Sequence, residues 1–115
     1  MTYDEMKAIV LGFPGAEEGT SYGQPSFKLN GKFFTRLRAE DQSLVLMDVP
    51  FDEREMLMEA EPATFHITPH YKDYPSVLAR MESLDPGSFR GFLERRFRKI
   101  AKKSVVKAWE AGQVR

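Results

Sequence analysis

The chain has 115 residues, of which 42% are hydrophobic and 30% charged, and it contains no cysteine. We expect one domain at this length. The absence of cysteine excludes disulfides, thiolate metal sites and cysteine nucleophiles. No apolar run approaches the roughly 18 residues of a membrane span. Residues 1–89 carry 8 basic and 15 acidic side chains, whereas 90–115 carry 9 and 2. This asymmetry indicates a basic face for a polyanion or, slightly favoured, a C-terminal helix held against an acidic body.

The chain opens with a predicted helix over about 2–11. Thr2 and Glu5 have the spacing of a capping box, and apolar residues follow at helical intervals. Gly12 and Pro14 then end the helix. Residues 14–25 are rich in glycine and proline and have no apolar period, so they predict an ordered loop.

From Ser26 the apolar period changes to two, and Asn30-Gly31 marks a hairpin turn. A two-residue loop would put the apolar residues of the two strands on different faces, whereas a bulged three-residue loop restores their parity. We therefore predict the bulged loop. The inward residues are then Phe27, Phe33, Thr35 and Leu37, and the outward residues are Lys28, Lys32, Phe34, Arg36 and Arg38.

The second half of the chain predicts three more strands and three helices. Asp52 and Glu55 repeat the capping-box spacing, and Asp85 followed by Pro86 opens a long helix with an apolar stripe. In chain order the predicted elements are a strand at 44–49, a helix at 52–60, strands at 64–67 and 76–82 joined by a loop at 68–75, the long helix, and a last helix at 105–111.

This order predicts an α+β fold. Hairpins imply antiparallel pairing, and helices at both ends of the chain imply a two-layer sandwich. We expect a single domain over 1–115 with an antiparallel sheet of about five strands and the N- and C-terminal helices packed on one face. No secretory signal is visible and cysteine is absent, so we expect a cytoplasmic protein. We also expect a monomer that does not bind membranes.

Five stretches taken together resemble the MmcQ/YjbR family: EEGTSYGQPSFK at 17–28, GKFFTRL at 31–37, TPHY at 68–71, YPSVL at 74–78, and the tail 101–109. They cover most of the chain in the expected order. The resemblance implies a compact domain similar in topology to bacterial frataxin. It also implies DNA binding through a pair of wing-like hairpins, the description commonly given to the family.

The first functional hypothesis is a nucleic-acid (DNA)-binding domain without catalysis. Cations that pair with phosphate and an aromatic ring that stacks on a base are both typical of such surfaces. A plain solvated sheet face would look the same. The candidate residues are those of the outward hairpin face and of the loop around His70: Lys28, Lys32, Phe34, Arg36, Arg38 and Lys72.

The alternative hypothesis is a small-molecule or protein-binding module with a pocket between loops 17–25 and 68–75. The second loop gathers a histidine and two tyrosines, a set found in pocket walls and equally in turns packed on a sheet edge. The net charge of zero favours this hypothesis, because DNA-binding domains are usually basic. The candidate residues are Glu18, Ser21, Tyr22, His70, Tyr71 and Tyr74, with Lys103 added because the family tail carries a lysine at the matching position.

We expect no enzymatic activity, no metal and no cofactor. Adjacent Glu17 and Glu18 normally diverge, and Ser21 has no histidine placed beside it by the sequence. His66 lies on a predicted strand and His70 in a loop, with no carboxylate at a ligand spacing. Phosphate-binding glycine motifs are absent.

Overall fold

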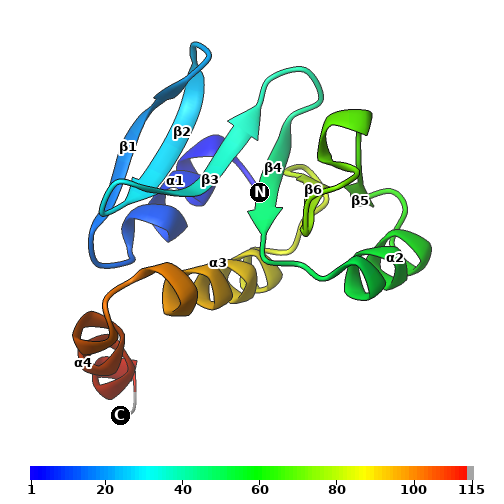
Figure 1. Ribbon diagram of the computed structural model, residues 1–115. Helices are drawn as coiled ribbons and strands as arrows, with labels where there is room; N and C mark the ends of the chain where they lie inside the picture. Colours follow the sequence, from blue (N-terminus) through cyan, green and yellow to red (C-terminus); the bar gives the residue numbers. More distant parts are fainter. Residues whose placement is uncertain (114–115) are drawn as a thin grey trace.

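The computed structural model describes residues 1–113 (Figure 1). These residues form four α-helices and six strands, with one short 3-10 helix between the last two strands. The helices are α1 (Tyr3–Leu11), α2 (Phe51–Ala60), α3 (Pro86–Ile100) and α4 (Lys103–Gln113). The strands are β1 (Ala16–Ser21), β2 (Gln24–Leu29), β3 (Lys32–Arg38), β4 (Ser43–Met47), β5 (Phe65–His66) and β6 (Ser76–Arg80), and the 3-10 helix is η1 (Pro69–Tyr71).

All six strands belong to one antiparallel sheet with the order β1-β2-β3-β4-β6-β5. The predicted α+β class is confirmed, with six strands where about five were expected. In Figure 1, α3 runs beneath the sheet, α2 lies beside β5 and β6, and α4 lies beyond the C-terminal end of α3. None of the helices in the described part is long and apolar enough to cross a membrane.

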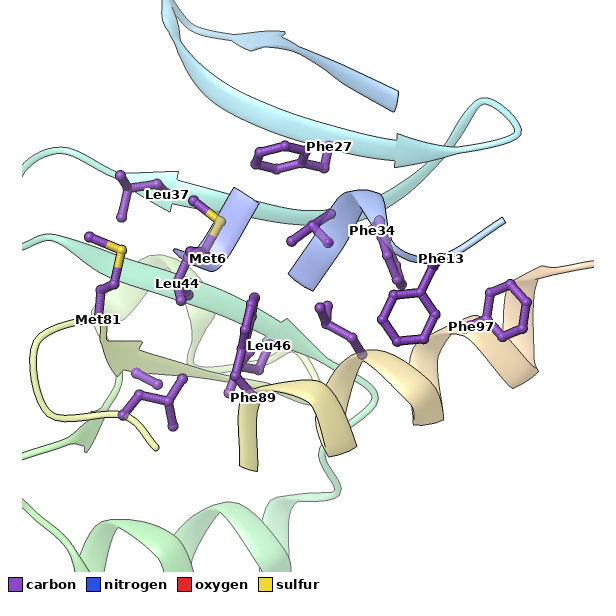
Figure 2. Close-up of a cluster of buried hydrophobic side chains, with 14 of the residues drawn as sticks. Met6, Phe13, Phe27, Phe34, Leu37, Leu44, Leu46, Met81, Phe89 and Phe97 are labelled. Carbon is purple, nitrogen blue, oxygen red and sulfur yellow. The ribbon is translucent and has the colours of Figure 1, made fainter. Parts of the chain in front are cut away.

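The core lies between one face of the sheet and helices α1 and α3. Figure 2 shows the buried side chains of both helices meeting those of the central strands. Phe13 packs edge-on against Phe34 at a ring distance of 5.5 Å and also contacts Phe97 at 5.4 Å. Trp109 from α4 stacks on Phe13 at 5.8 Å, so the last helix is attached to the same cluster. Each buried aromatic ring of this kind contributes about 1.5 to 3 kcal/mol.

The loop predicted over 14–25 is wrong, because Ala16–Ser21 forms strand β1. This strand is at the sheet edge, and its middle residues are exposed on both faces, so no alternating apolar pattern announces it. A two-residue turn joins β1 to β2. Its residues Tyr22 and Gly23 both have positive φ, 54° and 74°, as a type I′ turn requires.

The three-residue turn predicted for the second hairpin is also wrong, and with it the faces predicted for Phe33 and Phe34. Asn30 and Gly31 form a two-residue turn with φ of 52° and 82°. The irregularity lies inside the strands: Lys28 pairs with Phe33 and Phe27 pairs with Thr35, which leaves Phe34 as an extra residue in β3. The bulge turns Phe34 into the core, where it is 1% exposed, whereas Phe33 is half-buried on the other face.

Helix α2 does not use the predicted capping box. It begins at Phe51, and Pro50 occupies the N-cap position without a side-chain hydrogen bond. An ion pair between Glu53 and Arg95 of α3 links the two helices instead, at 2.8 Å.

The basic C-terminal segment pairs with acidic residues of the body, as the slightly favoured interpretation of the charge asymmetry predicts. Asp48, at the end of β4, accepts hydrogen bonds from Arg96 at 3.1 Å and from Lys99 at 2.8 Å. Arg96 also donates to the carbonyl oxygen of Phe33. These contacts hold α3 against β3 and β4.

Candidate functional site

A pocket of about 270 Å³ opens on the sheet face opposite α1 and α3. Its floor comes from the central strands, where residues two apart point to the same side. Val45 and Met47 of β4 lie beside Ser76 of β6, with Met47 and Ser76 paired in register. From β3, Phe33 and Arg36 complete the floor.

The two walls come from segments far apart in the sequence. Ser21 and Tyr22, at the tip of the β1–β2 hairpin, form one wall; His70, Tyr71 and Tyr74, in η1 and the turn after it, form the other. The His70 and Tyr71 rings stand almost perpendicular, 4.8 Å apart. Tyr22 is 94% exposed and Tyr74 is 55% exposed, so two large aromatic rings stand at the rim of the pocket with little packing of their own.

Arg54, the buried residue of α2, holds the η1 wall in place. Its guanidinium donates at 2.9 to 3.2 Å to four backbone carbonyl oxygens, those of Tyr71, Lys72 and Tyr74 in the wall and that of Ser76 at the start of β6. Four carbonyls around one cation fix the path of this segment. Sequence patterns did not single out Arg54, because a lone arginine among the acidic residues of α2 looks like a solvated side chain.

Arg36 joins the floor of the pocket to this wall. Its Nη2 donates to the Tyr71 hydroxyl at 3.2 Å, and its Nη1 donates to Gln24 Oε1 at 3.1 Å. Both partners are neutral. No carboxylate within residues 1–113 forms an ion pair with Arg36, although the side chain is half-buried.

Ser76 contributes an unpaired hydroxyl. The residue is fully buried and lines the pocket, and its Oγ has no hydrogen-bond partner. A buried hydroxyl without a partner is unfavourable by about 1 to 3 kcal/mol. The pocket floor therefore carries one polar group whose hydrogen bonding the protein leaves incomplete.

The residues proposed for nucleic-acid binding differ in burial and in partners. Phe34 is in the core, so its predicted exposure and its stacking role are withdrawn. Arg38 forms ion pairs with Glu40 and Asp41, both at 3.2 Å, and Arg36 belongs to the pocket. The three lysines Lys28, Lys32 and Lys72 are exposed, and Lys28 lies opposite Glu17 in the β1–β2 ladder.

The structure brings five of the predicted pocket residues together and leaves two elsewhere. The five are Ser21, Tyr22, His70, Tyr71 and Tyr74. Glu18 instead faces α1, where it accepts a hydrogen bond from Tyr3 and pairs with Lys7. These two partners lower the pKa of the Glu18 carboxyl below its ordinary value. Lys103 is exposed in the first turn of α4 and does not line the pocket.

A second polar cluster lies beside the pocket, where Ser43 and His66 share a hydrogen bond of 2.8 Å between Oγ and Nε2. Asp41 Oδ2 approaches the same ring nitrogen at 3.6 Å. In a catalytic triad the carboxylate contacts the other nitrogen of the ring. Ser43 is also fully buried, so a substrate has no route to its oxygen. The cluster therefore joins β4 to β5 without the geometry of a nucleophile.

Within residues 1–113, no group of three histidine, aspartate or glutamate side chains is arranged to hold a metal ion. His66 contacts Ser43 on the sheet, whereas His70 packs against Tyr71 in the pocket wall.

Comparison with protein-family models gives one match, to the model described as YjbR, over residues 11–99. The chain belongs to the YjbR family. Every residue that lines the pocket falls within the matched segment, as does Arg54, so the pocket is built wholly from the YjbR region of the chain. Comparisons with curated proteins and with solved structures found no match.

Proposed function

We propose that this YjbR protein is a binding module, without catalytic activity, that holds a small planar molecule between the β1–β2 hairpin tip and the η1 segment. One observation carries the proposal: two exposed aromatic rings, Tyr22 and Tyr74, flank a concave site whose floor is apolar at Val45 and Met47. Aromatic faces gain about 0.5 to 1.5 kcal/mol from stacking on another ring, beyond the burial of area. Sites of this shape favour a small molecule over the flatter surface of a protein partner.

Absence of catalysis is proposed from the chemistry of the lining residues. A nucleophile needs a base within hydrogen-bond reach. In the described part of the chain, His70 contacts Tyr71 and Tyr74, and no hydrogen bond joins it to Ser21 or Ser76.

Nucleic-acid binding is the second candidate, supported by the exposed lysines Lys28, Lys32 and Lys72. It would rest on phosphate contacts alone, because the one aromatic residue assigned to it is buried. Such contacts weaken steeply as salt concentration rises.

A thermal-shift screen tests the proposal. Small planar aromatic compounds are added to the wild-type protein and to a His70→Ala/Tyr74→Ala variant, which removes exposed rings and leaves the core intact. Met56→Ala is the matched control, because Met56 is an exposed apolar residue of α2 outside the pocket. A ligand that binds only the folded state at 100 times its Kd stabilises it by about 2.7 kcal/mol.

We expect compounds that raise the melting temperature of the wild type and of Met56→Ala, and fail to do so for the double variant. Duplex and single-stranded oligonucleotides are tested in parallel at low salt. The pocket proposal would be wrong if oligonucleotides, and none of the planar compounds, stabilised the protein, and if this effect were lost on replacing Lys28 and Lys32. Nucleic-acid binding would then be the better account.

A further inference from the structure

Arg36 is a half-buried cation at the pocket floor whose charge no side chain of the described part compensates. Its two side-chain partners, Gln24 and Tyr71, are neutral. Removing a charge from water is unfavourable unless an opposite charge or several hydrogen bonds replace the lost hydration. We propose that the pocket ligand carries a single carboxylate and that Arg36 recognises it; this inference rests on the function proposed above.

Other arginines of the fold show how its cations are usually satisfied. Arg38, on the same strand and the same face, pairs with Glu40 and Asp41. Arg96 pairs with Asp48. Arg54 lacks a carboxylate, but four carbonyl oxygens surround its guanidinium. Arg36 has neither kind of compensation and is the arginine that lines the pocket.

The guanidinium of Arg36 is also held ready for an anion. Gln24 accepts from Nη1 while its own amide nitrogen donates to Glu40 at 2.6 Å, so the glutamine is fixed from both sides. Tyr71 accepts from Nη2. These bonds use two of the five N–H groups, which leaves Nε and one hydrogen on each terminal nitrogen. A planar donor pair of this kind matches the two oxygens of a carboxylate.

Several features favour a carboxylate monoanion over a phosphate. Arg36 is the single lysine or arginine among the lining residues, whereas Lys72 lies outside the lining. A phosphate dianion usually takes several cations or the N-terminus of a helix, and η1 has only three residues. The volume of about 270 Å³ also falls below the usual lower limit of roughly 300 Å³ for ligand pockets, which favours a small molecule.

Ser76 lies in the pocket floor with an unpaired hydroxyl. It is fully buried and lines the floor beside Met47. Its Oγ is closed off from the pocket space, so the ligand meets apolar floor residues and the Arg36 guanidinium. The chemical class is therefore a small aromatic carboxylate, with its ring between Tyr22 and Tyr74 and its carboxylate at Arg36.

Isothermal titration calorimetry with a matched pair of probes tests the inference. The probes are 2-naphthoate and 2-naphthamide, which have the same ring and almost the same shape but differ in charge. We expect the wild type to bind 2-naphthoate about 10- to 100-fold more tightly, the range of a charge-assisted hydrogen bond. Arg36→Gln should abolish this preference. Arg36→Lys should keep part of it, because the charge stays and the planar donor pair is lost.

Lys28→Gln is the control for net charge. It removes one positive charge from the same sheet face outside the pocket and should leave the preference for 2-naphthoate unchanged. Circular dichroism of each variant establishes that it is folded, and Arg36→Lys provides a second test if Arg36→Gln is not.

Three results would overturn the inference. Equal affinity for the two probes would refute recognition of a carboxylate by Arg36. The binding function proposed for the pocket would still hold, because the amide would bind. Tighter binding of 2-naphthyl phosphate than of 2-naphthoate would show that the pocket prefers a phosphate dianion to a carboxylate monoanion. Failure of both probes to bind in the millimolar range would refute the aromatic carboxylate class, and the thermal-shift screen would then decide separately whether the pocket binds any planar molecule.

Discussion

The Arg36 guanidinium donates to the Tyr71 hydroxyl at 3.2 Å and so joins the middle of the sheet to the segment that covers it. The two residues are 35 positions apart in the sequence. On the other side of the same segment, Arg54 donates to the carbonyl oxygen of Tyr71 at 3.1 Å. One tyrosine is therefore held through its side chain by β3 and through its backbone by α2, and the shape of the pocket depends on both contacts.

Replacing Arg54 should loosen the pocket wall, because this one side chain bonds to four backbone carbonyl oxygens. Arg54→Met keeps the length of the side chain but leaves four carbonyl oxygens without this donor. We expect a loss of about 1 to 3 kcal/mol or more in the free energy of unfolding, because carbonyl oxygens that stay buried lose their donor. Denaturant unfolding measures the loss, and amide hydrogen exchange should show faster opening around 71–76. A loss below about 1 kcal/mol with unchanged exchange would show that other contacts hold the segment.

Replacing Arg36 should have little effect on stability in the absence of ligand. Its two hydrogen bonds to neutral groups stabilise the fold modestly, and removing an uncompensated charge from a half-buried position offsets their loss. We expect Arg36→Met to change the free energy of unfolding by less than about 1 kcal/mol. A much larger loss in denaturant titrations would assign Arg36 a structural role and weaken its assignment to a ligand.

The neighbouring residues Phe33 and Phe34 provide a matched test of the bulge. Phe34→Ala empties a position in the core next to Phe13 and should reduce the free energy of unfolding by about 3 to 5 kcal/mol. Phe33→Ala removes a half-buried ring from the pocket face, so we expect a clearly smaller loss. Melting temperatures of the two variants compare them directly. A larger loss for Phe33→Ala than for Phe34→Ala would instead support the three-residue loop, which places Phe33 in the core.

The structure explains why the sequence predicted some elements and missed others. Helices α1 and α3 were predicted because their signals are local: Thr2 and Asp85 do cap them, and the apolar residues follow the helical period. Strand β1 gave no such signal, since an edge strand exposed on both faces needs no apolar residues. The bulge at Phe34 lies within the strands, and rules for turn residues cannot detect it.

The sequence predicted only part of the candidate site, because the contacts between distant segments leave no local pattern. Tyr71 and Tyr74 were singled out because a histidine and two tyrosines in one loop can form a pocket wall, and they do line the pocket. Arg36 was placed on the correct outward face but was assigned to nucleic-acid binding, because the sequence does not show that Tyr71 and the hairpin tip enclose a pocket around it. Arg54 was missed altogether. Its partners are backbone carbonyls, and those leave no pattern in the sequence.

His66 should make stability depend on pH below neutrality. Burial lowers the pKa of its imidazole below the ordinary value of about 6.5, and the positive charges of Arg80 and Arg38 lower it further. Between the folded and unfolded pKa values the unfolded chain binds more protons, so the free energy of unfolding falls as pH falls through about 6.5 and levels off below the folded pKa.

Chemical denaturation at a series of pH values measures this dependence, with His66→Asn as the comparison. The wild type should lose more stability than the variant between neutrality and the folded pKa of His66. Glu5, Glu18 and Glu40 all have lowered pKa values, so their contributions are lost only at lower pH, as the carboxylates become protonated. Parallel curves for the two proteins across this range would contradict the assignment.

The central claim is the location of the binding site, and a chemical-shift titration of the ¹⁵N-labelled protein with 2-naphthoate tests it most directly. We predict that the largest changes in amide shifts cluster at residues from both walls and the floor, namely Ser21, Tyr22, Arg36, Met47, His70, Tyr71 and Tyr74. Amides of α4 and of the Asn30-Gly31 turn should barely move. Changes concentrated outside these residues, or no saturable change in the millimolar range, would contradict the assignment of the pocket as the site for an aromatic carboxylate.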